Sequence, residues 1–135
     1  MGALIDSSVL IQFERKGSVA SAALDSQEEF FVSVITASEL LHGVYRAADV
    51  GVRARRAACV NALLEAVPLL DVDLSTARVH AELWAGLAAK GSLIGPHDLW
   101  LASTAVARGL RLVTFNVREF DRVPGLEVDR WNPAP

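Results

Sequence analysis

The sequence predicts an α/β fold, a three-layer α/β/α sandwich built on a mainly parallel sheet of about five strands. Short apolar runs with the length and β-branched content of buried strands alternate along the chain with longer segments of helical periodicity. In addition, no repeat, low-complexity tract or linker rich in Pro, Gly or Ser divides the chain. A single domain is therefore expected over residues 1–135.

Five short apolar runs are the expected strands. The first is ALI, which is followed directly by Asp6, and the fourth is the longer run LRLVTF. Runs of this length suit buried strands better than helices, which need about ten residues or more. The expected strands cover residues 3–5, 30–34, 69–70, 110–115 and 126–128.

Helices are expected between these strands. Gly17 separates two short ones, and Thr36 stands in the capping position of a longer one. Apolar residues recur at a spacing of four within 75–90, as on one face of an amphipathic helix. Pro96 suits the first turn of the last helix and Gly109 its exit. The expected helices cover residues 8–15, 18–26, 37–48, 52–66, 75–90 and 96–108.

The composition limits the classes of protein to consider. Apolar residues make up 52% of the chain, but no apolar run approaches the roughly 18 residues that a membrane helix needs. The surplus apolar surface therefore predicts a dimer face or a partner protein, and Trp84 and Trp100 are expected in such a face or in the core. No secretion signal is recognisable and Cys59 is single, so a cytoplasmic location is expected, with Cys59 in the core.

The charge balance argues against a general nucleic-acid binder. The net charge is −3, whereas such proteins usually carry a basic surplus. That argument weakens if the acidic groups gather at one metal site with arginines on its rim. Arg53, Arg55 and Arg56 would suit an RNA backbone, although a solvated helix face is the favoured interpretation.

Polar side chains stand where the expected strands end. Ligands of parallel sheets gather at the carboxyl ends of the strands, close to the first turns of the following helices. Five oxygen-bearing side chains from four segments are expected at this edge, those of Asp6, Glu39, Asp98, Asn116 and Glu119.

Each acidic residue also has an ordinary structural explanation. Thr36 and Glu39 match a capping box, and Asp6 and Asp98 suit the first turn of a helix. Taken together, however, converging carboxylates would raise one another's pKa values unless a cation offset their charge. An oxygen-only donor set favours Mg²⁺ or Mn²⁺ over zinc, and the three histidines and Cys59 lack the spacing of a zinc site.

Four ordered segments of the chain resemble the successive motifs of PIN-domain nucleases, especially the VapC-type toxins of bacterial toxin–antitoxin pairs. The similarity spans nearly the whole chain and implies a single PIN-like domain. The four segments are LIDSSVLI at 4–11, ITASELLHGV at 35–44, IGPHDLWLASTAVARG at 94–109 and LVTFNVREFDRVPGLEV at 112–128.

The resemblance implies an Mg²⁺- or Mn²⁺-dependent endoribonuclease that acts as the toxin of a type II pair and inhibits translation or growth. It implies Asp6, Glu39 and Asp98 as catalytic metal ligands. Many members carry aspartate where this chain has Asn116, so either Asn116 or Glu119 fills the fourth position. Other residues follow from the same motifs: Ser8, Thr114 and Glu119 as supporting residues, and Arg118 as a contact to RNA or, equally, a solvent-facing residue.

The implied partners are an RNA substrate, a cognate antitoxin and a second copy of the chain, with no membrane partner. Helices 37–48 and 52–66 are the expected walls of an antitoxin groove. Two alternatives stay open. One is a metal-poor PIN-like module that docks a partner protein, which Asn116 and the acidic pI favour. The other, ranked last, is a phosphatase-like hydrolase with Asp6 as nucleophile, because Ser8 stands where that chemistry needs a second aspartate.

Overall fold

The computed structural model describes residues 2–16 and 29–131 of the chain, and the side chains of 13–16 are not among the described ones. The expected helix 18–26 lies outside the described residues.

A parallel sheet forms the middle layer of the described structure. Its five strands lie in the order β3-β2-β1-β4-β5, and every neighbouring pair is parallel. The chain fills one side of β1 first and then continues on the other side with β4, so the gap between β1 and β4 is the topological switch point. The strands are β1 (Ala3–Ile5), β2 (Phe30–Ser33), β3 (Leu69–Leu70), β4 (Arg111–Thr114) and β5 (Val128–Arg130).

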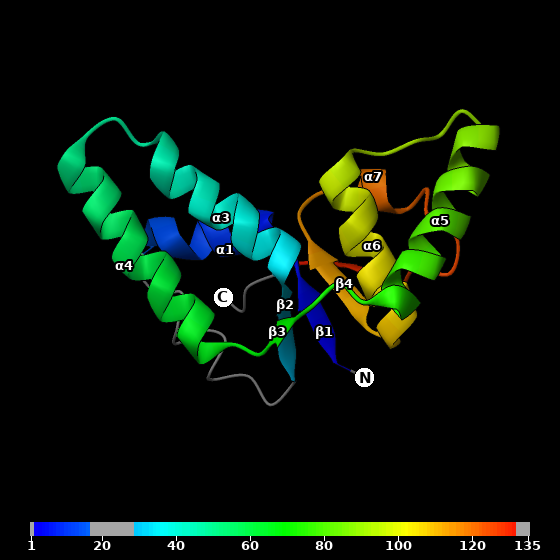
Figure 1. Cartoon of the computed structure of the whole chain (residues 1–135), viewed down its shortest axis with the longest axis horizontal. Coiled ribbons are helices and arrows are strands. Elements are labelled where there is room, and N and C mark those ends of the chain that lie inside the picture. The colour runs from blue at the N-terminus through cyan, green and yellow to red at the C-terminus, as the bar shows by residue number, and fades with distance from the viewer. Residues whose placement is uncertain (1, 17–28, 132–135) are drawn as a thin grey trace.

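Helices cover both faces of the sheet, as Figure 1 shows: α1, α3 and α4 lie to one side of the strands, and α5, α6 and α7 to the other. The three-layer prediction is therefore confirmed. The helices are α1 (Ser7–Lys16), α3 (Val34–Arg46), α4 (Val50–Ala66), α5 (Leu74–Ala89), α6 (Pro96–Arg108) and α7 (Val117–Phe120).

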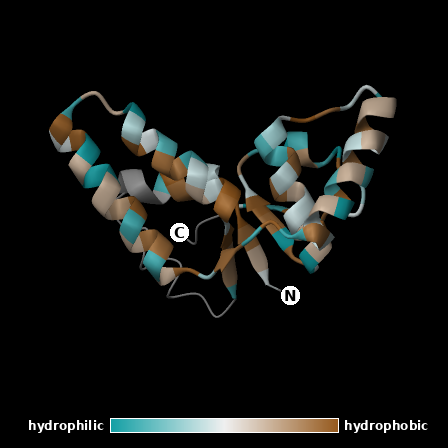
Figure 2. Ribbon diagram, in the orientation of Figure 1, coloured by the Kyte–Doolittle hydropathy of each residue, from teal (hydrophilic) through white to brown (hydrophobic). Residues whose placement is uncertain are grey.

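Two hydrophobic clusters fill the spaces between the layers. Successive residues of a strand point to opposite faces, so Ala3 and Ile5 join the cluster under α1, α3 and α4, while Leu4 joins the one under α5 and α6. Val113 and Leu112 of β4 divide in the same way. Figure 2 shows the resulting hydrophobic centre, with helices that carry both hydrophobic and hydrophilic residues around it.

Helix α3 begins three residues earlier than expected, which corrects the capping prediction. Ser33 is the N-cap, and its Oγ accepts a hydrogen bond from the backbone N–H of Ile35 at 3.0 Å. Thr36 is therefore an interior helical residue, fully buried, and Glu39 lies in the second turn rather than the first. The capping-box interpretation of Thr36 and Glu39 is wrong.

The expectation for the last strand is also wrong by two residues. The apolar run LEV ends where β5 begins, and the pairs Leu112–Val128, Val113–Asp129 and Thr114–Arg130 set the register. An edge strand contacts the sheet on one side only, so it can carry charged residues. Asp129 forms an ion pair with Arg111 of β4. Helix α7 was not predicted, since four residues are too few for a periodic pattern.

The exposure of the helices and of the two tryptophans and Cys59 agrees only in part with expectation. No helix in the described part of the chain has the length and apolar character to cross a membrane. Trp84 is 54% exposed and so does not lie in the core. The half-buried Trp100 stacks on His80 with the ring centroids 3.6 Å apart. Cys59 is only partly buried against the core, so the prediction that it lies in the core is correct in part.

Candidate active site

Asp6 lies at the carboxyl end of the central strand, between β1 and α1. Its backbone N–H donates to the carbonyl oxygen of Val113, which extends the pairing of β1 with β4 by one more bond. Its side chain is only 2% exposed. The strand end and the start of α1 therefore fix both the backbone and the carboxylate of Asp6 at the switch point of the sheet.

Three hydroxyl groups donate hydrogen bonds to the Asp6 carboxylate. The Oγ1 of Thr114 lies 2.7 Å from Oδ2, the Oγ of Ser8 lies 2.9 Å from the same oxygen, and the Oγ of Ser7 lies 3.4 Å from Oδ1. Bonds to a buried carboxylate are strong and hold its plane in one orientation. The buried aspartate is thus presented in a defined direction.

Two of these hydroxyls, those of Ser8 and Thr114, also hydrogen-bond to the loop that follows β4. The Oγ1 of Thr114 accepts the backbone N–H of Asn116 at 2.9 Å, and the Oγ of Ser8 accepts that of Phe115 at 3.2 Å. Ser8 and Thr114 therefore connect the ends of the two central strands. Asn116 enters this network through its backbone, and its side chain lies at the surface.

Asp98 lies in the first turn of α6, beside the same edge. The pKa of Asp98 is raised to about 7. Burial is the largest cause, followed by the negative charges of Asp6, Glu119 and Glu39 and by a hydrogen bond to Glu119. Glu119 is itself held at this helix start, because its Oε1 accepts the backbone N–H of Gly95 at 3.2 Å. Electrostatic repulsion at this position favours a neutral Asp98 or a bound cation.

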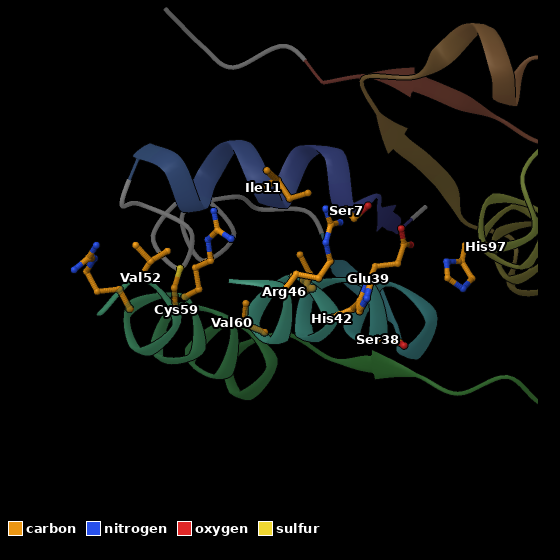
Figure 3. Close-up of a pocket in the computed structure, with 14 residues that line it drawn as sticks. Ser7, Ile11, Ser38, Glu39, His42, Arg46, Val52, Cys59, Val60 and His97 are labelled. Carbon is orange, nitrogen blue, oxygen red and sulfur yellow. The ribbon is translucent and has the colours of Figure 1, made fainter. Parts of the chain in front are cut away.

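Glu39 faces the cluster from α3. Burial raises the pKa of Glu39, the nearby charge of His97 lowers it, the charge of Asp6 raises it, and a hydrogen bond from Ser7 lowers it. Figure 3 shows the Glu39 carboxylate between Ser7 and His97. Asp6, which follows β1, and the carboxylates of α3, α6 and α7 are thus close enough to shift the pKa values of Asp98 and Glu39.

The donors fit a hard cation that keeps much of its water. Within residues 2–16 and 29–131, no three His, Cys, Asp or Glu side chains are arranged to hold a metal ion as they stand. Mg²⁺, however, is commonly held by one or two carboxylates and several waters rather than by a protein cage. The chemistry of the site, a set of oxygen donors that includes two carboxyl groups with a raised pKa, suits such an ion.

A groove of about 980 Å³ leads away from this cluster, between α1 and the pair α3–α4 (Figure 3). The two helices expected to form the walls of an antitoxin groove, now α3 and α4, line it on one side, whereas the contribution of α1 was not predicted. Ser7, which contacts both Asp6 and Glu39, was also missed, although its place directly after Asp6 could have indicated it. The lining residues are Ser7, Ile11, Ser38, Glu39, Leu40, His42, Gly43, Arg46, Val52, Arg55, Arg56, Cys59, Val60 and His97.

The arginines singled out from the sequence have different surroundings. Arg53 does not line this groove. Its Nε and Nη2 donate to the carbonyl oxygen of Ala47 at 3.0 and 2.8 Å. Arg55 and Arg56 do line it. Arg118 lies exposed on α7, outside the groove lining.

Comparison with known proteins agrees with the fold. Residues 3–126 match the PIN domain family. The chain is 30% identical over 128 residues to "Ribonuclease VapC" of Rickettsia bellii, with 95% of each chain covered. It is 36% identical over 100 residues to a "tRNA(fMet)-specific endonuclease VapC" of Salmonella typhimurium, with 74% of each chain covered.

A solved structure is similar over nearly the full length. The DNA-bound VapBC complex from Salmonella typhimurium contains a chain that superposes with a TM-score of 0.86 at 29% identity, covering 98% of this chain and 99% of that one. The family match over residues 3–126 and the 36% sequence identity to a VapC endonuclease define the class of protein. The chain belongs to the PIN-domain family, within the group of VapC ribonucleases.

Proposed function

We propose that this chain is a divalent-metal-dependent endoribonuclease and the toxin of a type II toxin–antitoxin pair. The observation that carries the proposal is the convergence of Asp6, Glu39, Asp98 and Glu119 from four separate segments of the chain, where burial and the charges of the other three carboxylates raise the pKa of Asp98 to about 7. A structural role alone would not need this repulsion. A cation between the carboxylates would relieve it.

Asp6, Asp98 and Glu39 are the residues that would hold the ion, Glu39 directly or through water. A bound Mg²⁺ or Mn²⁺ supplies a water of lowered pKa and neutralises charge on the phosphoryl oxygens. Asp6 would orient the attacking water, because its carboxylate is fixed by Thr114 and Ser8.

The fourth position of the site is filled by Glu119 rather than Asn116 in this proposal. Glu119 hydrogen-bonds to Asp98 and contributes to the raised pKa of Asp98. Asn116 takes part through its backbone N–H. Its side chain is left to position water or substrate at the rim of the site.

The proposal is tested by RNA cleavage with purified protein in Mg²⁺ or Mn²⁺. Asp6→Asn and Asp98→Asn should each lower the cleavage rate by about 100-fold or more, because each removes a charged ligand of the ion. Asp121→Asn changes an exposed aspartate at the end of α7 and should leave the rate unchanged. Wild-type cleavage by both site variants, folded as judged by circular dichroism, would end the proposal.

One observation favours a second candidate, a metal-poor module that docks a partner protein. It is the lack, in the described residues, of three donors already arranged around a metal. Calorimetric titration with Mn²⁺ separates the two. The nuclease should bind Mn²⁺, and Asp98→Asn should weaken that binding about 10-fold or more, whereas a docking module would give no heat of binding.

An antitoxin is the proposed protein partner. The similar chains from Rickettsia felis and Salmonella typhimurium come from VapBC complexes bound to DNA. Exposed apolar side chains on this chain, Tyr45 at 77% and Val50 at 78%, suit a surface that an antitoxin or a second copy covers. A cytoplasmic location follows for a toxin that acts on cellular RNA.

A further inference from the structure

We infer that the groove between α1 and the α3–α4 pair binds the backbone of single-stranded RNA, with Arg46 and Arg55 contacting its phosphates. The inference rests on the proposed ribonuclease function and names the path of the substrate from the carboxylates. It assigns positioning roles to two residues that lie outside the acidic cluster.

The sign of the charge in the groove is opposite to that of the whole chain. The chain carries a net charge of −3, yet the lining of the groove, among the residues that the structure describes, holds three arginines, two histidines and a single glutamate. Such a local concentration of positive charge suits phosphate groups, which attract Arg side chains by charge and by forked hydrogen bonds. The one glutamate, Glu39, stands at the end that joins the acidic cluster.

One face of α3 leads from the acidic cluster into the groove. Glu39, His42 and Arg46 all line the groove, and they are three and four residues apart, so they share that face. A helix rises about 1.5 Å per residue, which places Arg46 roughly 10 Å along the axis from Glu39. This distance separates the two backbones only, because the Arg46 side chain extends across the groove toward Ser7 (Figure 3). There it could bind a phosphate next to the reacting one, as a binding contact rather than a catalytic one.

Helix α4 continues the wall that α3 begins, opposite α1 (Figure 3). Arg55 lines the groove from α4 and is exposed. Ile11 of α1, 39% exposed, and Val52 add apolar surface between the charged groups. A groove with a basic wall and apolar surface beside it suits a strand whose phosphates and bases face different sides.

The test measures binding and cleavage separately. Binding of a fluorescent single-stranded RNA is measured by anisotropy in EDTA, where the metal is removed, at several salt concentrations. Neutralising two phosphate contacts on single-stranded nucleic acid should reduce the salt slope by about 1.4, since each contributes about 0.7. Arg46→Gln with Arg55→Gln should therefore weaken binding about 10-fold and flatten the slope.

Two further variants serve as controls. Arg46→Lys with Arg55→Lys keeps the charge and should retain most of the salt slope. Arg78→Gln removes an exposed arginine from α5, outside the groove lining, and should bind RNA like the wild type. In cleavage assays with Mg²⁺, the double glutamine variant should raise KM about 10-fold and change kcat little, as expected when a uniform binding contact is lost.

The outcomes distinguish this inference from the proposed function. If the wild type cleaves RNA but the double glutamine variant keeps its RNA affinity, salt slope and KM, the groove is not the RNA path and serves a protein partner or solvent instead. If the wild type neither binds nor cleaves RNA, the proposed function fails, and the inference fails with it. Weaker binding by the double glutamine variant alone, with a flatter slope, supports the inference.

Discussion

Thr114 connects three parts of the site with one hydroxyl group. It donates to the Asp6 carboxylate and accepts the backbone N–H of Asn116, while its side chain is fully buried. A hydroxyl that both donates and accepts in a buried place cannot be replaced by water without rearrangement. The orientation of Asp6 and the path of the chain after β4 therefore depend on the same atom.

Thr114→Val should lower both stability and turnover. The valine leaves a buried carboxylate with one hydroxyl donor fewer, which costs about 1–3 kcal/mol of unfolding free energy. Loss of the donor that orients a metal ligand should lower kcat about 10- to 100-fold, with little change in KM. Urea unfolding and steady-state RNA cleavage measure the two effects.

Thr114→Ser is the matched control for this residue. Serine keeps the donor and the acceptor, so it should restore most of kcat. Wild-type kcat in the valine variant would show that the hydroxyl stabilises the fold without positioning Asp6.

At the scale of elements, α3 shows how a helix start places a site residue. Ser33 is the last residue of β2 and also the N-cap of α3, so the helix begins directly at the sheet. Glu39 then falls in the second turn, where it lines the groove and lies beside Ser7. A helix that began at Thr36 would have turned Glu39 toward its own backbone instead.

Two substitutions in α3 should have opposite consequences. Ser33→Ala removes the acceptor for the backbone N–H of Ile35 and should cost about 1 kcal/mol, up to ~2 kcal/mol. Thr36→Val should be neutral or slightly stabilising, because the buried Oγ1 of Thr36 has no hydrogen-bond partner in the described residues. Urea unfolding of both variants measures the difference.

The result bears on which residue caps the helix. A large loss of stability in Thr36→Val, together with a neutral Ser33→Ala, would restore the capping box expected from the sequence. The opposite pattern would confirm Ser33 as the cap in solution.

The sequence predicted most elements because their signals are local. Strand β1 and helix α6 have the expected bounds, since an apolar run and a Pro–Gly pair mark them. The predicted start of α3 was wrong because Thr36 is a good capping residue in sequence. In the structure, the helix begins where the pairing of β2 with its neighbours ends, at Ser33. β5 was misplaced for the same reason: its register comes from β4, not from its own apolar residues.

The site could be predicted as a set of residue types but not as an arrangement. The carboxylates stand after strands or at helix starts, and parallel topology brings such positions together. The contacts of Ser7, the placement of Glu119 at Gly95 and the groove along α3 depend on how separate elements pack. No local pattern contains that information.

At the scale of the whole molecule, folding brings together carboxylates that would otherwise be far apart. The folded chain raises the pKa of Asp98 from 3.8 to about 7, so the ionised form of Asp98 is less favourable in the folded state than in the unfolded state. The folded protein then binds more protons than the unfolded one between these two values. Its stability should accordingly fall as the pH rises through this range and stay reduced above it.

Asp98→Asn should therefore stabilise the metal-free protein at high pH. The amide carries no charge, so the difference in unfolding free energy between the variant and the wild type should grow from pH 5 to pH 8. Because Asp98 is only partly buried, solvent screening reduces the effect, and about 1–2 kcal/mol is expected at pH 8. Urea unfolding in EDTA at several pH values measures it. Saturating Mn²⁺ should reverse the order, since the ion stabilises only the protein that binds it. A difference that is flat with pH would contradict the raised pKa of Asp98.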